Sequence, residues 1–143
     1  MKTTKCIVVA VFLIGCTQKS THTSETESLA LLMFEAFNQH DWKKMAGYYA
    51  EEAEFLDPSL GKAFVRQSRE ATAAKYADMQ QVFPDIRDEV SAVHVAGDAV
   101  IVQFTSRGTM ADSSAFELPI VTVLTFRDGL IVRDATYYDL ENP

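Results

Sequence analysis

A tight turn between two long runs of β-forming residues constrains the fold of this chain more than any other feature. Residues 120–139 read IVTVLTFRDGLIVRDATYYD, and the pair Asp128-Gly129 lies in their middle. An Asp-Gly pair between β-branched and aromatic residues is a strong signal for a two-residue hairpin. We therefore predict two long antiparallel strands here, Phe116–Phe126 and Leu130–Asp139.

Two more strands are expected before this hairpin. The pattern switches to a period of two over Ile86–Val95 and Ala99–Thr109, with Val100, Val102 and Phe104 on one face of the second segment, which is the period of a strand with one buried face. Ala96-Gly97-Asp98 supplies the turn between them.

The residues before these strands show the three- and four-residue spacing of helices. Asp41 and Ser68 are suitable N-caps for the second and third predicted helices. The predicted helices are Leu29–Gln39, Asp41–Ala50 and Arg69–Val82, and a short strand is expected at Ala53–Leu56. The buried face of the first helix is expected to comprise Leu29, Leu32, Met33, Ala36 and Phe37.

Helices followed by strands indicate an α+β fold. We expect three helices packed on one strongly curved, mainly antiparallel sheet, which together form a cone-shaped barrel with a mouth that can hold a ligand. The chain has 143 residues, 48% of them hydrophobic, so it suits a single domain with its own core.

The charge of the chain excludes one class of partner. Its formal net charge is −7, and its lysines and arginines form no cluster in the sequence. Binding to phosphate backbones needs a positive surface, so we predict no nucleic-acid partner.

The first residues are predicted to be a signal peptide. Lys2 and Lys5 precede the apolar run Cys6–Ile14, which is far shorter than the roughly 20 residues of a membrane-spanning helix. Leu13-Ile14-Gly15-Cys16 resembles the bacterial lipoprotein signal, in which the cysteine becomes the lipidated first residue. An ordinary signal peptide or a buried N-terminal strand is the alternative.

The lipoprotein interpretation implies a location and a domain organisation. We expect residues 1–15 to be the signal peptide, residues 16–28 a polar tether and residues 29–143 the folded domain. The protein would be lipid-anchored in the bacterial cell envelope through Cys16. Thr17 follows this cysteine, and the absence of Asp there resembles the sorting pattern for the outer membrane, on its periplasmic side.

No metal site or cofactor is predicted. Cys6 and Cys16 both lie in or at the end of the signal, which leaves the domain without a thiol. His22, His40 and His94 are not spaced as metal ligands.

The order of the elements resembles the nuclear transport factor 2-like fold and, within it, the SnoaL-like group. The resemblance covers about Leu29 to Asp139. The motifs that carry it are Tyr49-Ala50-Glu51-Glu52, Asp57-Pro58, Gly61, Phe83-Pro84-Asp85, Gly97-Asp98, Arg107-Gly108-Thr109, Phe126–Val132 and Tyr138-Asp139. The superfamily includes isomerases, cyclases, dehydratases, epoxide hydrolases and binding domains, so the fold alone does not assign a function.

Two relatives suggest catalytic carboxylates. Asp57 matches the general base of ketosteroid isomerase, but Met33 and Thr122 occupy the positions of its oxyanion donors, which argues against steroid isomerisation. Asp139 matches the acid/base residue of the SnoaL-like polyketide cyclases. A histidine common in these cyclases is replaced by Met110.

The last strand is expected to line the cavity with its odd-numbered residues. Strict alternation places Ile131, Arg133, Ala135, Tyr137 and Asp139 on one face. Asp139 would then be an acid/base group whose pKa is raised by apolar walls, with Asp57 as its partner and with Tyr137 and Arg133 touching the ligand. The alternatives are solvated carboxylates at strand ends and an arginine on the outer face.

Two more residues are candidate ligand contacts. Tyr49 would present its hydroxyl to the ligand, or else pack a helix onto the sheet. His94 lies between Val93 and Val95 and is either a pocket acid/base or a surface residue.

Two functions follow from these features. The first is an envelope-anchored domain that binds a small, largely apolar molecule and catalyses proton transfer, as an isomerase or cyclase without a cofactor. The second is a non-catalytic ligand-binding or dimerisation module. Folds of this class often pair through the outer face of the sheet, so we expect a homodimer.

Overall fold

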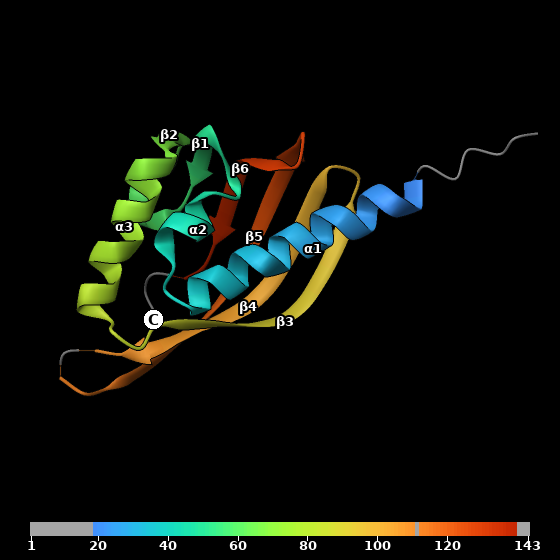
Figure 1. Ribbon diagram of the computed structural model, residues 1–143. Helices are drawn as coiled ribbons and strands as arrows, with labels where there is room; N and C mark the ends of the chain where they lie inside the picture. Colours follow the sequence, from blue (N-terminus) through green and yellow to red (C-terminus); the bar gives the residue numbers. More distant parts are fainter. Residues whose placement is uncertain (1–18, 111, 140–143) are drawn as a thin grey trace, which may run out of the picture.

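The computed structural model describes residues 19–110 and 112–139, with side chains from residue 25 onward. Three helices, one short 3-10 turn and six strands follow one another along the chain (Figure 1). The bounds are α1 Lys19–Asn38, α2 Trp42–Ala46, β1 Tyr49–Leu56, η1 Pro58–Leu60, β2 Val65–Ser68, α3 Arg69–Val82, β3 Arg87–Ala96, β4 Ala99–Thr109, β5 Ala115–Arg127 and β6 Leu130–Tyr137.

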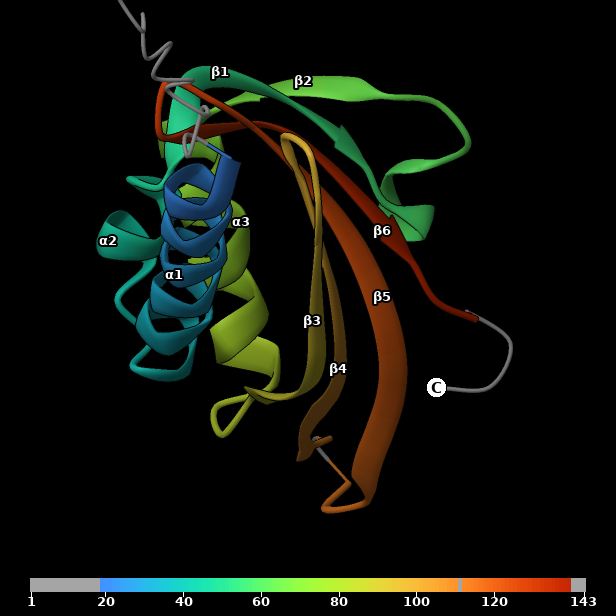
Figure 2. The ribbon, with the colours of Figure 1, turned by 90° about the vertical axis from the view of Figure 1, so that its right-hand side faces the viewer.

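The six strands form one sheet in the order β2-β1-β6-β5-β4-β3. Only β1 and β6 pair in parallel, and the other neighbours are antiparallel. The sheet curls around the helices, which all lie on its concave side (Figure 2). The predicted α+β fold with a strongly curved, mainly antiparallel sheet is confirmed. No helix in the described ranges is long and apolar enough to cross a membrane.

The predicted hairpin forms at Asp128-Gly129. Both residues have positive φ angles, 53° and 76°, as a type I′ turn requires. The long strands β5 and β6 extend from this turn, and Leu124 and Ile131 bury their side chains completely on the concave side.

The first helix begins ten residues earlier than the sequence pattern indicated. Residues 19–28, predicted to be part of a tether, are the first half of α1. Thr26 is 2% exposed, so the helix packs onto the fold at a residue that was predicted to belong to the tether. The prediction relied on apolar residues and therefore missed a buried threonine. Leu32, expected in the core, is 42% exposed, and Phe34 is buried instead.

The second helix is shorter than expected. Asp41 caps it as predicted, since its carboxylate accepts a hydrogen bond from the Lys44 amide at 3.0 Å. The helix ends at Ala46, and Tyr49 already belongs to β1. Tyr49 therefore reaches the core from the sheet and not from a helix.

A β-bulge in β6 changes which residues face the concave side. Phe126 pairs with Ile131 and Thr125 pairs with Arg133, so Val132 has no partner of its own on β5. A bulge adds one residue to a strand and shifts the alternation of its side chains. Beyond Val132, the even-numbered residues face inward, beginning with Asp134. The prediction that Ile131, Arg133, Ala135, Tyr137 and Asp139 share one face is wrong for this reason.

Candidate functional site

Asp134 lies at the centre of a polar cluster on the inner face of the sheet. The Tyr49 hydroxyl of β1 donates to its Oδ2 at 2.7 Å. The Thr122 hydroxyl of β5 donates to Oδ1 at 2.5 Å, and the Thr136 hydroxyl lies 2.9 Å from the same oxygen. Three strands therefore meet at one carboxylate, which is 7% exposed.

Burial raises the pKa of Asp134, although the Thr122, Tyr49 and Thr136 hydroxyls partly offset this effect. Burial, followed by the charge of Asp134, raises the pKa of Tyr49 well above its ordinary value. Tyr49 therefore stays a hydrogen-bond donor at physiological pH. Tyr49 lies on the inner face, where it was predicted to contact a ligand. Its hydroxyl has a carboxylate partner, Asp134, that the sequence pattern did not reveal.

Asp57 lies at the end of β1, where solvent reaches the inner face. Its Oδ1 accepts hydrogen bonds from the Ser59 hydroxyl at 2.6 Å and from the Tyr138 hydroxyl at 2.8 Å. Lys75 of α3 lies 3.1 Å from Oδ2. Partial burial would raise the pKa of Asp57, but Ser59, Lys75 and Tyr138 together lower it below its ordinary value. Asp57 is therefore ionised at neutral pH.

Asp88 of β3 is the third inward carboxylate. The Asn38 side chain of α1 holds its backbone with two hydrogen bonds, one to the Asp88 carbonyl at 2.8 Å and one from the Asp88 amide at 2.7 Å. The side chain is 8% exposed, and its Oδ1 atom has no hydrogen-bond partner in the described part of the chain. Burial raises the pKa of Asp88 to about 7, against a smaller opposing effect of the Ser106 hydroxyl.

The pKa of Tyr76, on α3, responds to all three carboxylates. Burial raises the pKa of Tyr76, and the charges of Asp134, Asp57 and Asp88 raise it further. Its ring packs edge-on against Phe37 and stacks on Trp42. The inner face therefore combines aromatic walls with three carboxyl groups around one tyrosine.

Several residues of α3, β5 and β6 and of the segments that follow β1 and β6 are partly exposed. We call the ones on the inner face the inner-face rim. They are Asp57, Lys75, Ile120, Thr136 and Tyr138. Two shallow hollows of about 380 and 400 Å³ lie elsewhere, around Asp85 and Thr109, and neither is lined by rim residues.

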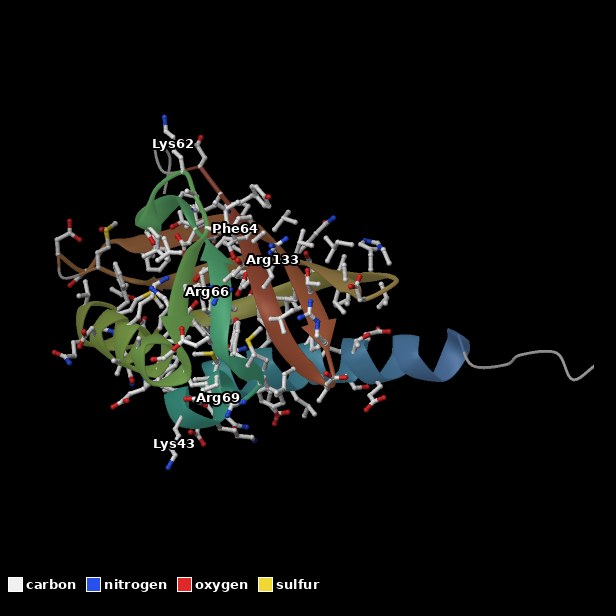
Figure 3. The ribbon with its side chains drawn as sticks, turned by 90° about the horizontal axis from the view of Figure 1, so that it is seen from above. Lys43, Lys62, Phe64, Arg66, Arg69 and Arg133 are labelled. Carbon is white, nitrogen blue, oxygen red and sulfur yellow. The ribbon has the colours of Figure 1, made fainter. Side chains whose placement is uncertain are left out.

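The structure places Asp139, Arg133 and Tyr137 away from the inner face. Asp139 is exposed and Tyr137 is 54% exposed. Arg133 donates to Glu54 Oε2 at 2.6 Å and lies over the Phe64 ring at 4.6 Å. Figure 3 shows Arg133 beside Phe64. The expected pairing of Arg133 with Asp139 is therefore replaced by a surface pair with Glu54.

His94 is exposed on β3, where it pairs with Ile101 in the register. It lies on β3, which is an edge strand of the sheet. The interpretation of His94 as a surface residue fits this placement.

Sequence reasoning missed several residues of this site, among them Asp134, Asp88, Tyr138 and Lys75. The bulge at Val132 hid Asp134 and Tyr138, because nothing in the local sequence marks the extra residue. Asp88 had a usable signal, since it stands two positions after Ile86 and two before Val90, which face inward. A charged residue in the apolar phase of a strand is costly unless it has a role.

Across the described ranges, no group of three or more histidine, cysteine, aspartate or glutamate side chains is arranged to hold a metal ion. The charges of Asp57, Asp88 and Asp134 each raise the pKa of Tyr76.

The family model of the SnoaL-like domain matches residues 31–134 of the chain. No curated protein matches the sequence. Among solved structures, the fold is similar to that of IdmH from Streptomyces antibioticus, assigned as a polyketide cyclase. The two chains share 25% identity over 80% of this chain and 91% of that one, with a TM-score of 0.70.

Two further structures share the fold at lower identity. An epoxide hydrolase of the LEH-like type from M. tuberculosis is 16% identical, with coverage of 85% and 87% and a TM-score of 0.71. A protein from Catenulispora acidiphila with a ketosteroid isomerase-like fold, solved in complex with trimethylamine, is 19% identical, with coverage of 78% and 85% and a TM-score of 0.70. The predicted nuclear transport factor 2-like resemblance is confirmed.

Proposed function

Because the chain belongs to the SnoaL-like domain family, we propose that it binds a small, largely apolar molecule at the inner-face rim and transfers a proton within it. The observation that carries this proposal is the opposite shift of inward carboxyl groups. The pKa of Asp57 is lowered, so Asp57 is ionised, whereas burial raises the pKa values of Asp88 and Asp134. Environments that push carboxyl pKa values apart are typical of acid/base sites.

Asp57 is the proton acceptor in this proposal. Its Oδ2 removes an acidic C–H proton, and the electron pair of that bond moves into the adjacent carbonyl of the ligand. Lys75, 3.1 Å from Oδ2, lies where it can stabilise the resulting enolate oxygen. Tyr138, which donates to Asp57 before the reaction, becomes available to the same oxygen once Asp57 is protonated. Return of the proton to another carbon completes an isomerisation.

A general carbon acid tests this assignment without knowledge of the natural ligand. The probe is 5-nitrobenzisoxazole, whose isoxazole ring opens by N–O cleavage when a carboxylate removes the proton on C3, giving a cyanophenolate. We expect Asp57→Asn to lower the rate by roughly 100-fold. The control is Asp98→Asn, because Asp98 is an exposed carboxylate in the β3–β4 turn.

The same assay discriminates Asp57 from Asp139. A loss of rate in Asp139→Asn with none in Asp57→Asn would assign the base to Asp139, as the cyclase resemblance suggested. No acceleration by the wild-type protein over free acetate would favour the non-catalytic binding module. The dense aromatic packing of Phe34 on Phe104 and of Phe37 on Trp42 supports that second function.

We also propose that two copies pair through the outer face of the sheet. Val121 of β5 is 37% exposed and Tyr137 of β6 is 54% exposed on this face, and apolar side chains in such a position favour self-association. Val121→Glu should convert a dimer into a monomer in light scattering. Arg127→Glu, at the exposed end of β5, is the control. A wild-type protein that is monomeric at high concentration would contradict the proposal.

The predicted lipid anchor remains part of the proposed function. Cys16 and the signal segment lie outside the described residues, and the support for both is the sequence pattern alone. Mass spectrometry of the protein extracted from bacterial membranes should find Cys16 as a diacylated or triacylated N-terminus. An unmodified chain that still contains Gly15 would contradict the anchor and the envelope location.

A further inference from the structure

A short stretch at the edge of the sheet is exposed although it carries apolar side chains. Every residue from 61 to 66 is exposed, and β2, to which Val65 and Arg66 belong, is an edge strand. The Phe64 side chain is 42% exposed and Val65 is 37% exposed. Apolar side chains that lie together at a surface, with charged neighbours around them, are typical of a contact surface.

Cations lie around the Phe64 ring. The Arg133 guanidinium of β6 lies over the ring at 4.6 Å, and Lys62 and Arg66 are two positions away from Phe64 in the chain. Figure 3 shows these side chains on the same side of the molecule. We call this group the β2 patch; it consists of Lys62, Phe64, Arg66 and Arg133. Because the patch combines two separate parts of the chain, no run of basic residues marks it in the sequence.

The β2 patch is positive on a chain whose formal net charge is −7. Arg133 pairs with Glu54 at 2.6 Å. The hydrogen bond and the charge of Arg133, followed by the charge of Arg66, lower the pKa of Glu54. Among the described residues, neither Lys62 nor Arg66 forms a salt bridge. Two further carboxylates of β1 lie toward its other end, where Arg69 pairs with one of them. The cations of the patch are therefore only partly balanced.

This combination of side chains suits the surface of an anionic lipid bilayer. Such a surface offers phosphates to lysine and arginine and, just below them, an apolar layer to an aromatic ring. Basic residues near anionic lipids each add to binding, and aromatic rings favour the level of the headgroups. Neither of the two hollows described above borders the patch, so the patch suits an extended surface better than a small ligand.

The position of the proposed lipid anchor favours the same contact. α1 begins at Lys19, three residues after Cys16, and three residues of fully extended chain span at most about 11 Å. In Figure 1 and Figure 2 the N-terminal end of α1 is its upper end, and β1 and β2 lie at the top of the molecule. A lipid on Cys16 would therefore hold the upper side, which carries the β2 patch, near the bilayer.

We propose that the β2 patch docks on the surface of an anionic bilayer, with the Phe64 ring among the headgroups and the cations of the patch at lipid phosphates. The proposal rests on the proposed anchor for access to a membrane, and it adds a second contact that fixes the orientation of the domain. Once the anchor is inserted, docking of the patch is an intramolecular step, so even a weak surface contact is effective.

Co-sedimentation with vesicles tests the patch without the anchor. The protein is the chain from Thr17 onward, which contains every helix and strand of the fold. The vesicles contain phosphatidylcholine alone, or phosphatidylcholine with an equal amount of phosphatidylglycerol. We expect binding to the mixed vesicles only, at low ionic strength, and loss of binding as added salt screens the charges. The net charge of the whole chain predicts the opposite, repulsion from anionic vesicles.

Removal of two cations from the patch should weaken binding most. The double variant Lys62→Gln with Arg66→Gln is expected to lower the partition coefficient for mixed vesicles by about thirtyfold. The matched control is Arg87→Gln with Arg107→Gln. These two arginines face each other in the register of β3 and β4, at the lower end of the molecule in Figure 1, so their loss removes the same charge and should leave binding unchanged.

The Phe64 ring is tested in the same way. Phe64→Ser should weaken binding by about tenfold, because its apolar surface no longer enters the bilayer. Val82→Ser, at a side chain that is 56% exposed at the end of α3, is the control and should bind as the wild type does. The side chains of the patch are all exposed, so these variants should fold, and circular dichroism checks each one. If one fails to fold, the other still tests the patch.

Several results would overturn the proposal. Equal binding to both kinds of vesicle, or to neither, would exclude the anionic bilayer, and an equal loss in the control variants would exclude the patch as the contact. Binding of polyglutamate but not of vesicles would assign an acidic protein partner. Dissociation of a dimer by the patch variants, seen in light scattering without vesicles, would assign a second copy of this chain.

The proposed function is tested separately from this docking. The patch contains no residue of the inner-face rim, so the patch variants should open 5-nitrobenzisoxazole at the wild-type rate even where they no longer bind vesicles. The anchor is tested by the mass of the N-terminus at Cys16, whereas the vesicle experiment uses a chain that lacks this residue.

Discussion

Arg133 and Asp134 are neighbours in the chain, yet they lie in opposite environments. Arg133 is on the outer face, with Glu54 and the Phe64 ring as exposed partners. Asp134 is on the inner face, 7% exposed and surrounded by hydroxyl groups. The outer pair is screened by water and contributes little to stability. The Asp134 carboxylate is bound by hydroxyl groups from three strands, so its removal should change the free energy of unfolding far more than removal of the outer pair.

Among the buried carboxyl groups of the inner face, Asp88 should have the largest effect on the free energy of unfolding. Its raised pKa means that the folded state holds the proton more tightly than the unfolded chain does. Its contribution to stability is therefore complete below about pH 4 and is lost as pH rises to about 7, with a ceiling of about 4 kcal/mol. Asp88→Asn should lack this decline in urea unfolding measured from pH 4 to pH 8. Parallel pH profiles of variant and wild type would contradict the burial of this charge.

Replacing Asp134 should cost almost as much. In Asp134→Ala, the hydroxyls of Tyr49 and Thr122 lose their acceptor in a buried place, and we expect a loss of about 3 kcal/mol in the free energy of unfolding. The measurement is urea unfolding at pH 7. A loss no larger than that of an exposed alanine variant, such as Asp98→Ala, would show that the cluster is not part of the folding core.

Deleting Val132 should have a smaller effect. Its removal turns the bulge into regular pairing, in which Ile131 still faces inward, Arg133 outward and Asp134 inward. We expect the variant to fold with a loss below about 2 kcal/mol. Deleting Ala135 instead should unfold the protein or nearly so, because it turns Thr136 and Tyr138 outward. Thermal unfolding followed by circular dichroism compares the two deletions, and equal losses would refute the bulge.

The outer pair should give the smallest effect. Arg133 lowers the pKa of Glu54 through a hydrogen bond and through its charge, but both side chains lie at the surface and are reached by solvent. Glu54→Gln should therefore leave the urea midpoint unchanged within error at pH 7. A clear shift would mean that this face is covered in solution, which the proposed dimer would explain, and the shift should then disappear in Val121→Glu.

The sequence predicted the architecture because its signals are local. Asp128-Gly129 specified a hairpin, and alternating residues located β4 at its observed bounds. Ser68 caps α3, since its hydroxyl oxygen accepts a 3.1 Å hydrogen bond from the Ala71 amide. The start of α1 escaped this reasoning, since a buried Thr26 does not look like a core residue. The end of α2 was also missed, because Tyr49 fits a helical period as well as a strand.

The candidate site depended on information that no local pattern holds. The bulge at Val132 exchanges the two faces of β6, and it is fixed by pairing with β5 and with β1 at once. Strict alternation therefore selected Tyr137 and Asp139, whereas the tertiary structure turned Asp134 and Tyr138 inward.

The sequence by itself determined the order of the predicted helices and long strands and the antiparallel pairing of those strands, and it predicted Asp57 as a candidate site residue. Only the tertiary structure decided which carboxyl groups are buried and what surrounds them. The physical reason is that propensity and periodicity act over a few residues, whereas the pKa of Asp88 or Asp134 depends on desolvation by strands and helices far away in the chain.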